Sequence, residues 1–157
     1  MEERFIERTE FSDYDDFYKN YKLKIPENFN FGYDVMDELA KTNPNGKALV
    51  WTNDEGDYYE ITFAKMKELS DAAASFYMQM GIKRGDFVML VLQRRYEFWI
   101  SIVALCKIGA VAIPASHMLT KEDYEYRFNA VNIKMILCVN DEGVMNHVDE
   151  AAKVSPN

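Results

Sequence analysis

Hydrophobic residues along the chain fall into short solid blocks and into longer stretches of helical period. Three blocks, at 87–92, 111–113 and 135–139, contain only apolar residues. A strand that helices cover on both faces reads as such a block, because neither of its faces meets water. The segments between the blocks carry apolar residues at helical spacing. The pattern therefore predicts a β-α-β-α-β unit with a parallel sheet.

Helix-start and helix-stop residues delimit the expected helices. Thr62 can cap a long helix that Gly81 ends. Thr120 and Asp123 have the spacing of a capping box, in which each satisfies a free N–H group at the start of a helix. The expected helices cover residues 63–80, 95–107, 121–131 and 143–153.

The part of the chain before residue 62 has a different pattern. Segments 48–52 and 58–62 are rich in β-branched and aromatic residues and flank a turn with Gly56, which predicts an antiparallel hairpin. A short helix is expected at 33–42. The acidic turn between the two strands lacks the ligand spacing of a calcium loop, and we interpret it as a solvated turn. The expected fold class is α/β, an open and mainly parallel sheet with flanking helices and an N-terminal β-hairpin.

The first residues form a separate unit in this interpretation. Aromatic residues recur at helical spacing between Tyr14 and Tyr21, among several acids. We expect this arm either to drape over the body through its rings or, as the favoured alternative, to dock on it as an ordinary helix. The predicted division is an arm at 1–32 and a partial α/β lobe at 33–157.

Composition and charge exclude several classes of function. The 157 residues carry a net charge of −8, which opposes binding to nucleic acid or to an anionic membrane. No apolar run reaches the roughly 18 residues that cross a bilayer, and the N-terminus is too charged for a secretory signal. Cys106 and Cys138 lie in apolar runs, which favours burial over a disulfide or a metal site. We expect a cytoplasmic protein.

Candidate ligand-binding residues follow the predicted strands. In an open parallel sheet ligands bind at the carboxyl ends of the strands, which here are followed by 93–94, 115–118 and 140–143. Arg94 could contact an anion or be a solvated charge. His117 could transfer a proton or contact a phosphate, but a lone imidazole is more often a loop residue. Glycine-rich phosphate loops, a nucleophile elbow and metal-ligand pairs are not found in the sequence, so we assign no catalytic residue and no metal ligand.

Four stretches in order carry a family resemblance. They are GIKRGDFVMLVL at 81–92, RYEFWI at 95–100, IGAVAIP at 108–114 and LTKEDYEYR at 119–127. With the Asp-Glu-Gly of the hairpin at 54–56, this series resembles the N-terminal part of the AMP-forming acyl-CoA synthetases, in particular the medium-chain and acetyl-type enzymes. These belong to the adenylate-forming ligases.

The resemblance implies a two-step ligase for the full-length protein. ATP and a short- or medium-chain carboxylic acid give an acyl-adenylate and pyrophosphate, with Mg²⁺ assisting, and the thiol of CoA then displaces AMP. The family's phosphate loop, adenine- and ribose-contacting segments and adenylation lysine lie beyond the matched region. The chain is therefore expected to be an incomplete N-terminal lobe that is inactive alone, and its incomplete sheet is expected to promote self-association.

The resemblance also suggests a weak CoA-side site. In medium-chain relatives a polar residue in the loop after the I-P strand lies near CoA; that position here is Met118, with His117 beside it. The arginines that approach the CoA phosphates in acetyl-type relatives are replaced by Met145 and Val148. Two alternatives remain open: a non-catalytic α/β module that binds a partner or small ligand, and a peptide-synthetase adenylation domain or luciferase-like enzyme of the same fold.

Overall fold

Three parallel strands form the central sheet of the protein, whose computed structural model describes residues 2–155. The strand β3 (Phe87–Val91) lies between β4 (Val111–Pro114) and β5 (Ile133–Cys138), so the strand order is β4-β3-β5. Both pairings are parallel. The β-α-β-α-β unit predicted from the three apolar blocks is confirmed.

The central strand β3 is buried on both faces. Residues 88–91 are each 0% exposed. Because side chains alternate along a strand, Val88 and Leu90 belong to one hydrophobic cluster and Met89 and Val91 to another. This two-sided burial explains why the segment contains no polar residue.

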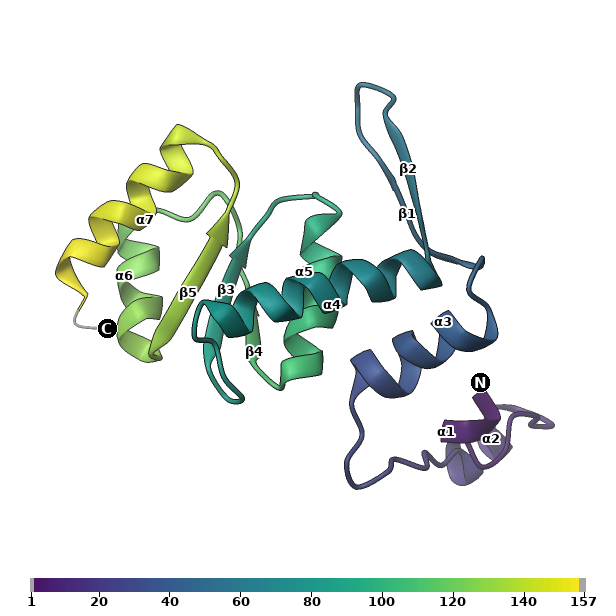
Figure 1. Ribbon diagram of the computed structural model, residues 1–157. Coiled ribbons are helices and arrows are strands. Elements are labelled where there is room, and N and C mark those ends of the chain that lie inside the picture. Colours follow the sequence, from purple (N-terminus) through teal and green to yellow (C-terminus); the bar gives the residue numbers. More distant parts are fainter. Residues whose placement is uncertain (1, 156–157) are drawn as a thin grey trace.

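Two pairs of helices cover the two faces of the sheet (Figure 1). α4 (Phe63–Gln79) and α5 (Glu97–Ile108) supply the side chains that pack on Val88 and Leu90. On the other face, α6 (Lys121–Ala130) and α7 (Glu142–Val154) pack on the second cluster. Each large apolar side chain that is fully buried in these layers contributes about 1.5–3 kcal/mol.

Capping residues that local sequence indicates are found at the ends of the helices. The Thr62 hydroxyl accepts a hydrogen bond from the backbone N–H of Lys65 at the start of α4. Thr120 and Asp123 form a complete capping box at the start of α6. Gly109 ends α5 with a φ of +70°, a left-handed conformation that suits glycine.

The predicted hairpin is also confirmed. β1 (Lys47–Thr52) pairs with β2 (Tyr58–Thr62) in antiparallel fashion. Gly56 adopts a φ of +89° in the turn. The Asn53 side chain accepts a hydrogen bond from the N–H of Asp57 at 2.8 Å. The turn is therefore held by its own amide side chain and needs no bound ion to close.

The described residues before β1 form one isolated antiparallel bridge, between Ile6 and Leu23, and four short helices. They are α1 (Glu2–Phe5), α2 (Tyr14–Asn20), η1 (Gly32–Asp37) and α3 (Glu38–Thr42). The helix predicted at 33–42 is thus present, but its first half, η1, has the wider turns of a π-helix.

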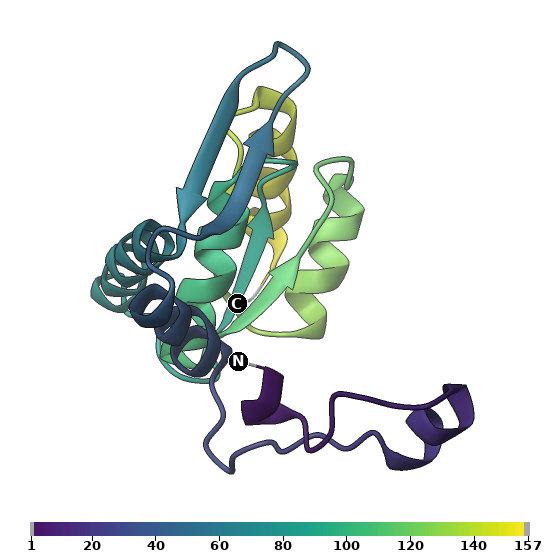
Figure 2. The same ribbon diagram turned by 90° about the vertical axis from the view of Figure 1, so that its right-hand side faces the viewer.

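We expected the arm to drape over the body or to dock on it as a helix, but its helix α2 does neither. Figure 2 shows α2 far from the sheet, at the end of an extended segment. Within α2, Tyr14 and Tyr18 are 73% and 75% exposed. The polar anchors of this helix are local: the Asp16 carboxylate accepts a hydrogen bond from the Ser12 backbone N–H and pairs with Arg8. These two contacts, the backbone one first, lower the pKa of Asp16 to about 2.

Polar contacts of Arg4 and Asn30 join the arm to the body. The Arg4 guanidinium lies 2.8 Å from the Asp34 carboxylate. The side-chain amide of Asn30 donates to the Cys106 carbonyl at 2.7 Å. The division of the chain between residues 32 and 33 stays a prediction.

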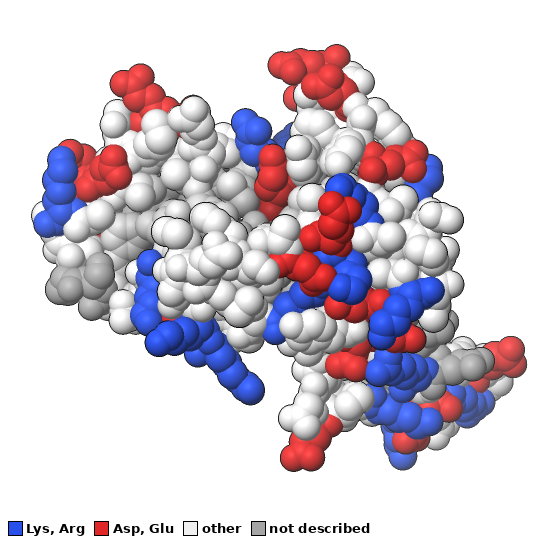
Figure 3. Space-filling model, in the orientation of Figure 1, with Lys and Arg blue, Asp and Glu red and all other residues white. Residues whose placement is uncertain are grey.

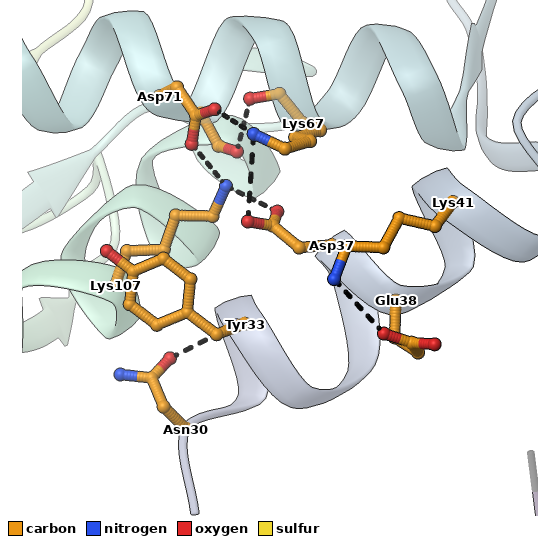
Figure 4. Close-up of polar contacts among 9 residues, drawn as sticks. Asn30, Tyr33, Asp37, Glu38, Lys41, Lys67, Asp71 and Lys107 are labelled. Carbon is orange, nitrogen blue, oxygen red and sulfur yellow. Dashed lines mark hydrogen bonds and ion pairs between the residues drawn. The ribbon is translucent and has the colours of Figure 1, made fainter.

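A buried ion cluster connects η1 to α4 and α5 (Figure 4). The ammonium group of Lys107, on α5, lies 2.6 Å from an Asp37 oxygen and 2.5 Å from an Asp71 oxygen. The Lys107 side chain is only 1% exposed and the Asp37 side chain 10%. Lys67 also pairs with Asp71. Three segments that are far apart in the sequence therefore meet around one buried cation.

The same cluster sets the charge state of Asp71. Burial alone would raise the pKa of this carboxyl group, but hydrogen bonds from Lys107 and Lys67 outweigh burial and lower the pKa. Asp71 is therefore ionised at neutral pH, as a partner of Lys107 has to be.

We predict that Lys107→Met strongly destabilises the protein. The substitution removes the closer of the two cations that face Asp37 and leaves only Lys67, at 3.8 Å. Loss of one partner from a buried ion pair typically costs about 3–5 kcal/mol. Urea unfolding followed by circular dichroism measures the change in free energy of unfolding. Lys41→Met is the matched control, because Lys41 is 69% exposed in a surface pair with Glu38 and should change stability by less than about 0.5 kcal/mol. Equal effects of the two substitutions would contradict the role of the cluster.

Candidate functional site

The segments that follow β3 and β4 lie at the carboxyl edge of the sheet, and we call the residues of these segments that line a common cleft the rim. Its residues are Gln93, Arg94, Ala115, Ser116 and His117, and they line one cleft of about 530 Å³. Parallel neighbours end at the same edge of a sheet, which is why segments on either side of α5 meet here. The structure thus brings Arg94 and His117 together, as the predicted topology requires.

Two other candidate segments lie outside the rim. Met118 is not among the residues that line this cleft and is 80% exposed. Segment 140–143 follows β5, which pairs with the opposite edge of β3 from β4. There Asp141 caps α7, and its carboxylate accepts a hydrogen bond from the N–H of Val144 at 3.0 Å. The three strand-end segments lie at the same carboxyl edge of the sheet, because the strands are parallel, but only the first two line the rim cleft.

The turn that leaves β3 has a strained backbone. Gln93 has a φ of +51°, and no other non-glycine residue within the described range has a positive φ. A side chain makes this left-handed conformation unfavourable, and such residues cluster at functional sites. The N–H of Arg95 closes the turn by donating to the Leu92 carbonyl at 3.1 Å. The chain direction changes sharply here, directly before Arg94.

A second cleft adjoins the rim. It has a volume of about 470 Å³ and lies between the hairpin turn and the start of α5. Gln93 and Arg94 line both clefts. Figure 3 shows acidic side chains gathered at the tip of the hairpin and basic ones beside it. One wall of this second cleft carries Asp54, Glu55 and Asp57, and the other carries Arg94 and Arg95. No ion pair among residues 2–155 joins the two walls.

The loop after β4 is held by two polar contacts. The Ser116 hydroxyl accepts a hydrogen bond from the N–H of Met118 at 3.1 Å. Nδ1 of His147, on α7, lies 3.2 Å from the Leu119 carbonyl. Sequence reasoning gave His147 no such role, and no local signal could have found it, because the two residues are 28 positions apart.

The two thiols are not reactive groups. Cys106 and Cys138 are partly buried and unpaired. Burial raises the pKa of both thiols, which keeps them protonated at neutral pH. Among residues 2–155 no three His, Cys, Asp or Glu side chains are grouped to hold a metal ion. Within the same range, no helix is both long and apolar enough to cross a membrane.

Solved structures of acyl-CoA ligases share this fold. A fatty acyl CoA synthetase from Mycobacterium tuberculosis aligns with a TM-score of 0.68 and 23% identity, over 76% of this chain and 23% of that protein. The N-terminal domain of FACL13 from the same organism aligns with a TM-score of 0.67 and 22% identity, over 82% of this chain and 30% of that one. The fold class expected from the sequence, an open and mainly parallel α/β sheet with flanking helices and an N-terminal β-hairpin, is confirmed.

A rat protein named mitochondrial acyl-coenzyme A synthetase ACSM5 is 37% identical over 142 residues, or 87% of this chain and 24% of the relative. The chain thus spans about a quarter of the length of the relatives it matches. These relatives are named as mitochondrial, so the predicted cytoplasmic location is wrong. Free, partly buried cysteines suit any reducing compartment, so they did not distinguish the cytoplasm from the mitochondrion.

The sequence profile of the AMP-binding enzymes matches residues 36–156. This region contains the whole parallel sheet, its four covering helices and the rim. The family resemblance carried by the four sequence stretches is confirmed. Since the match covers most of the chain, the chain belongs to the AMP-binding enzyme family.

Proposed function

We propose that the protein containing this chain is an AMP-forming acyl-CoA synthetase. A short- or medium-chain carboxylate attacks the α-phosphate of ATP and releases pyrophosphate, and the thiol of CoA then attacks the acyl-adenylate and releases AMP. The observation that carries the proposal is the family match over 36–156, together with 37% identity to a protein named as an acyl-coenzyme A synthetase. The same relatives support a mitochondrial location.

In this proposal the rim supplies part of the surface that faces the anionic cofactors, ATP and CoA. The planar guanidinium of Arg94 can bind two oxygens of a phosphate at once. His117 lies in the same cleft and can donate a hydrogen bond to a phosphate. Met118 adjoins them but offers only a thioether side chain that faces solvent. The donors present fit a phosphate group.

Magnesium in this proposal neutralises phosphate charge in the adenylation step. The described residues contain no group of three carboxylate, imidazole or thiolate side chains. Mg²⁺ is usually bound by only one or two carboxylates together with the phosphates of the nucleotide. In this proposal the role of this chain is to position those phosphates through the rim.

We predict that the chain alone does not form an acyl-adenylate. The motifs that contact the triphosphate in the family are not found in its sequence. ATP–pyrophosphate exchange with acetate and octanoate should stay at background, while circular dichroism confirms that the chain is folded. Exchange above background by the purified chain would contradict this prediction.

We also propose that the isolated chain self-associates through the open edge of its sheet. Each outer strand, β4 and β5, has only one neighbouring strand, and unpaired edges promote association. Val111, on β4, is 41% exposed.

Sedimentation velocity at several concentrations should show a growing dimer or larger species. Val111→Lys should weaken this association, because a charge opposes edge pairing. Val50→Lys on the hairpin is the control, since Val50 is similarly exposed at 48% but lies outside the parallel sheet. A monomer at every concentration would contradict the proposal.

A further inference from the structure

The hairpin contacts the turn after β3 at one place. The indole N–H of Trp51, on β1, donates a hydrogen bond of 2.6 Å to the backbone carbonyl of Arg94. The Trp51 ring also packs edge-on against Tyr96, with centroids 5.5 Å apart at 79°. Tyr59, on β2, approaches the same Tyr96 ring at 5.0 Å. We call these three rings, of Trp51, Tyr59 and Tyr96, the aromatic clamp.

The geometry of the hairpin makes the clamp possible. Trp51 and Tyr59 are direct partners across β1 and β2, and side chains of directly opposed residues lie on the same face of a hairpin. The two rings therefore reach Tyr96 together. Tyr96 itself packs against the hydrophobic cluster that contains Ile61 and Ile100, so the clamp is anchored to the body of the protein.

The aromatic clamp contacts the turn after β3, whose backbone conformation is strained. Gln93 is held in the left-handed region, at a φ of +51°. Such a conformation persists only when its surroundings enforce it. The hydrogen bond from Trp51 is made to the residue directly after Gln93. It therefore restrains the strained turn from outside the sheet.

Arg94 depends on this restraint for its position. Its guanidinium makes no ion pair with any residue in the range 2–155, so its backbone has to direct it. It lines both the rim cleft and the cleft beside the hairpin. A turn that relaxed at Gln93 would change the cleft into which this side chain points.

We infer that Trp51 is a positioning residue, which through its hydrogen bond to the Arg94 carbonyl directs the Arg94 guanidinium to phosphate groups at the rim. This inference rests on the proposed function, because it assumes that the rim receives a phosphate. It gives the hairpin a role in cofactor binding without direct contact to the cofactor. Trp51 contributes preorganisation, which lowers the entropy lost when a ligand binds.

The test is a titration of the ¹⁵N-labelled chain with CoA, followed through the amide shifts of the rim residues. Trp51→Phe removes the donor and keeps an aromatic ring, and it should weaken CoA binding about fivefold, as expected for one neutral hydrogen bond. Arg94→Ala should weaken binding further. Val50→Ala is the matched control, because Val50 neighbours Trp51 on β1 but points to the other face of the hairpin, and it should leave binding unchanged.

A double substitution separates positioning from a general structural effect. In the Arg94→Ala background, Trp51→Phe should have no additional effect on CoA binding, while the melting temperatures of the two single variants stay close to that of the original chain. If Trp51→Phe weakened binding equally in both backgrounds, or had no effect while Arg94→Ala did, the inference would be overturned and the proposed rim site would stand. Rim amides of the original chain that do not respond to CoA would overturn both.

Discussion

The burial of β3 on every side is the constraint on which the rest of the structure depends. The strand has a neighbour at each edge and a pair of helices on each face, and residues 88–91 have no exposed surface. A strand in this position has to be apolar throughout and has to be surrounded by parallel crossovers. The chain reaches solvent directly after the carboxyl end of β3, at Gln93, and this is where the rim forms.

Polar interactions then attach the outer segments to this apolar centre. The charge of Lys107, on α5, is buried, and it pairs with Asp37 of η1 and Asp71 of α4. A buried ion pair gains little stability over an apolar contact of the same size, because desolvation offsets the attraction. The hairpin is attached in another way, through aromatic rings and one hydrogen bond to the turn before α5.

Family membership and local geometry contribute different parts of the functional argument. The shared fold extends to ligases that are only 22–23% identical, so the fold alone does not define a substrate. The relatives above 30% identity carry the proposal of an acyl-CoA synthetase. Within the chain, the features that suit this role are the strained turn at Gln93 and the guanidinium of Arg94, which makes no ion pair among residues 2–155.

The sequence by itself determined the elements and their order. Apolar blocks, helical periods, the Thr62 and Thr120 caps and the hairpin turn at Gly56 depend on interactions between residues only a few positions apart, so each leaves a local signal. The parallel arrangement followed from these signals, and with it the meeting of Arg94 and His117. Segment 140–143 also lies at this carboxyl edge, since β5 is parallel to β3, but the local pattern does not say on which side of β3 the last strand lies and therefore which segments share a cleft.

Tertiary structure alone decided the contacts that orient the site. Lys107 meets Asp37, Trp51 meets Arg94 and His147 meets Leu119 only after the strand order β4-β3-β5 and the helix layers are in place. The amphipathic pattern of α2 likewise did not indicate that this helix is exposed. The Asp16 carboxylate is bound within the arm itself, by the Ser12 N–H and the Arg8 guanidinium. Local propensity selects helices and strands. A charge or an indole N–H, in contrast, can bind a partner that is distant in the sequence, and no local sequence pattern indicates which residue that partner is.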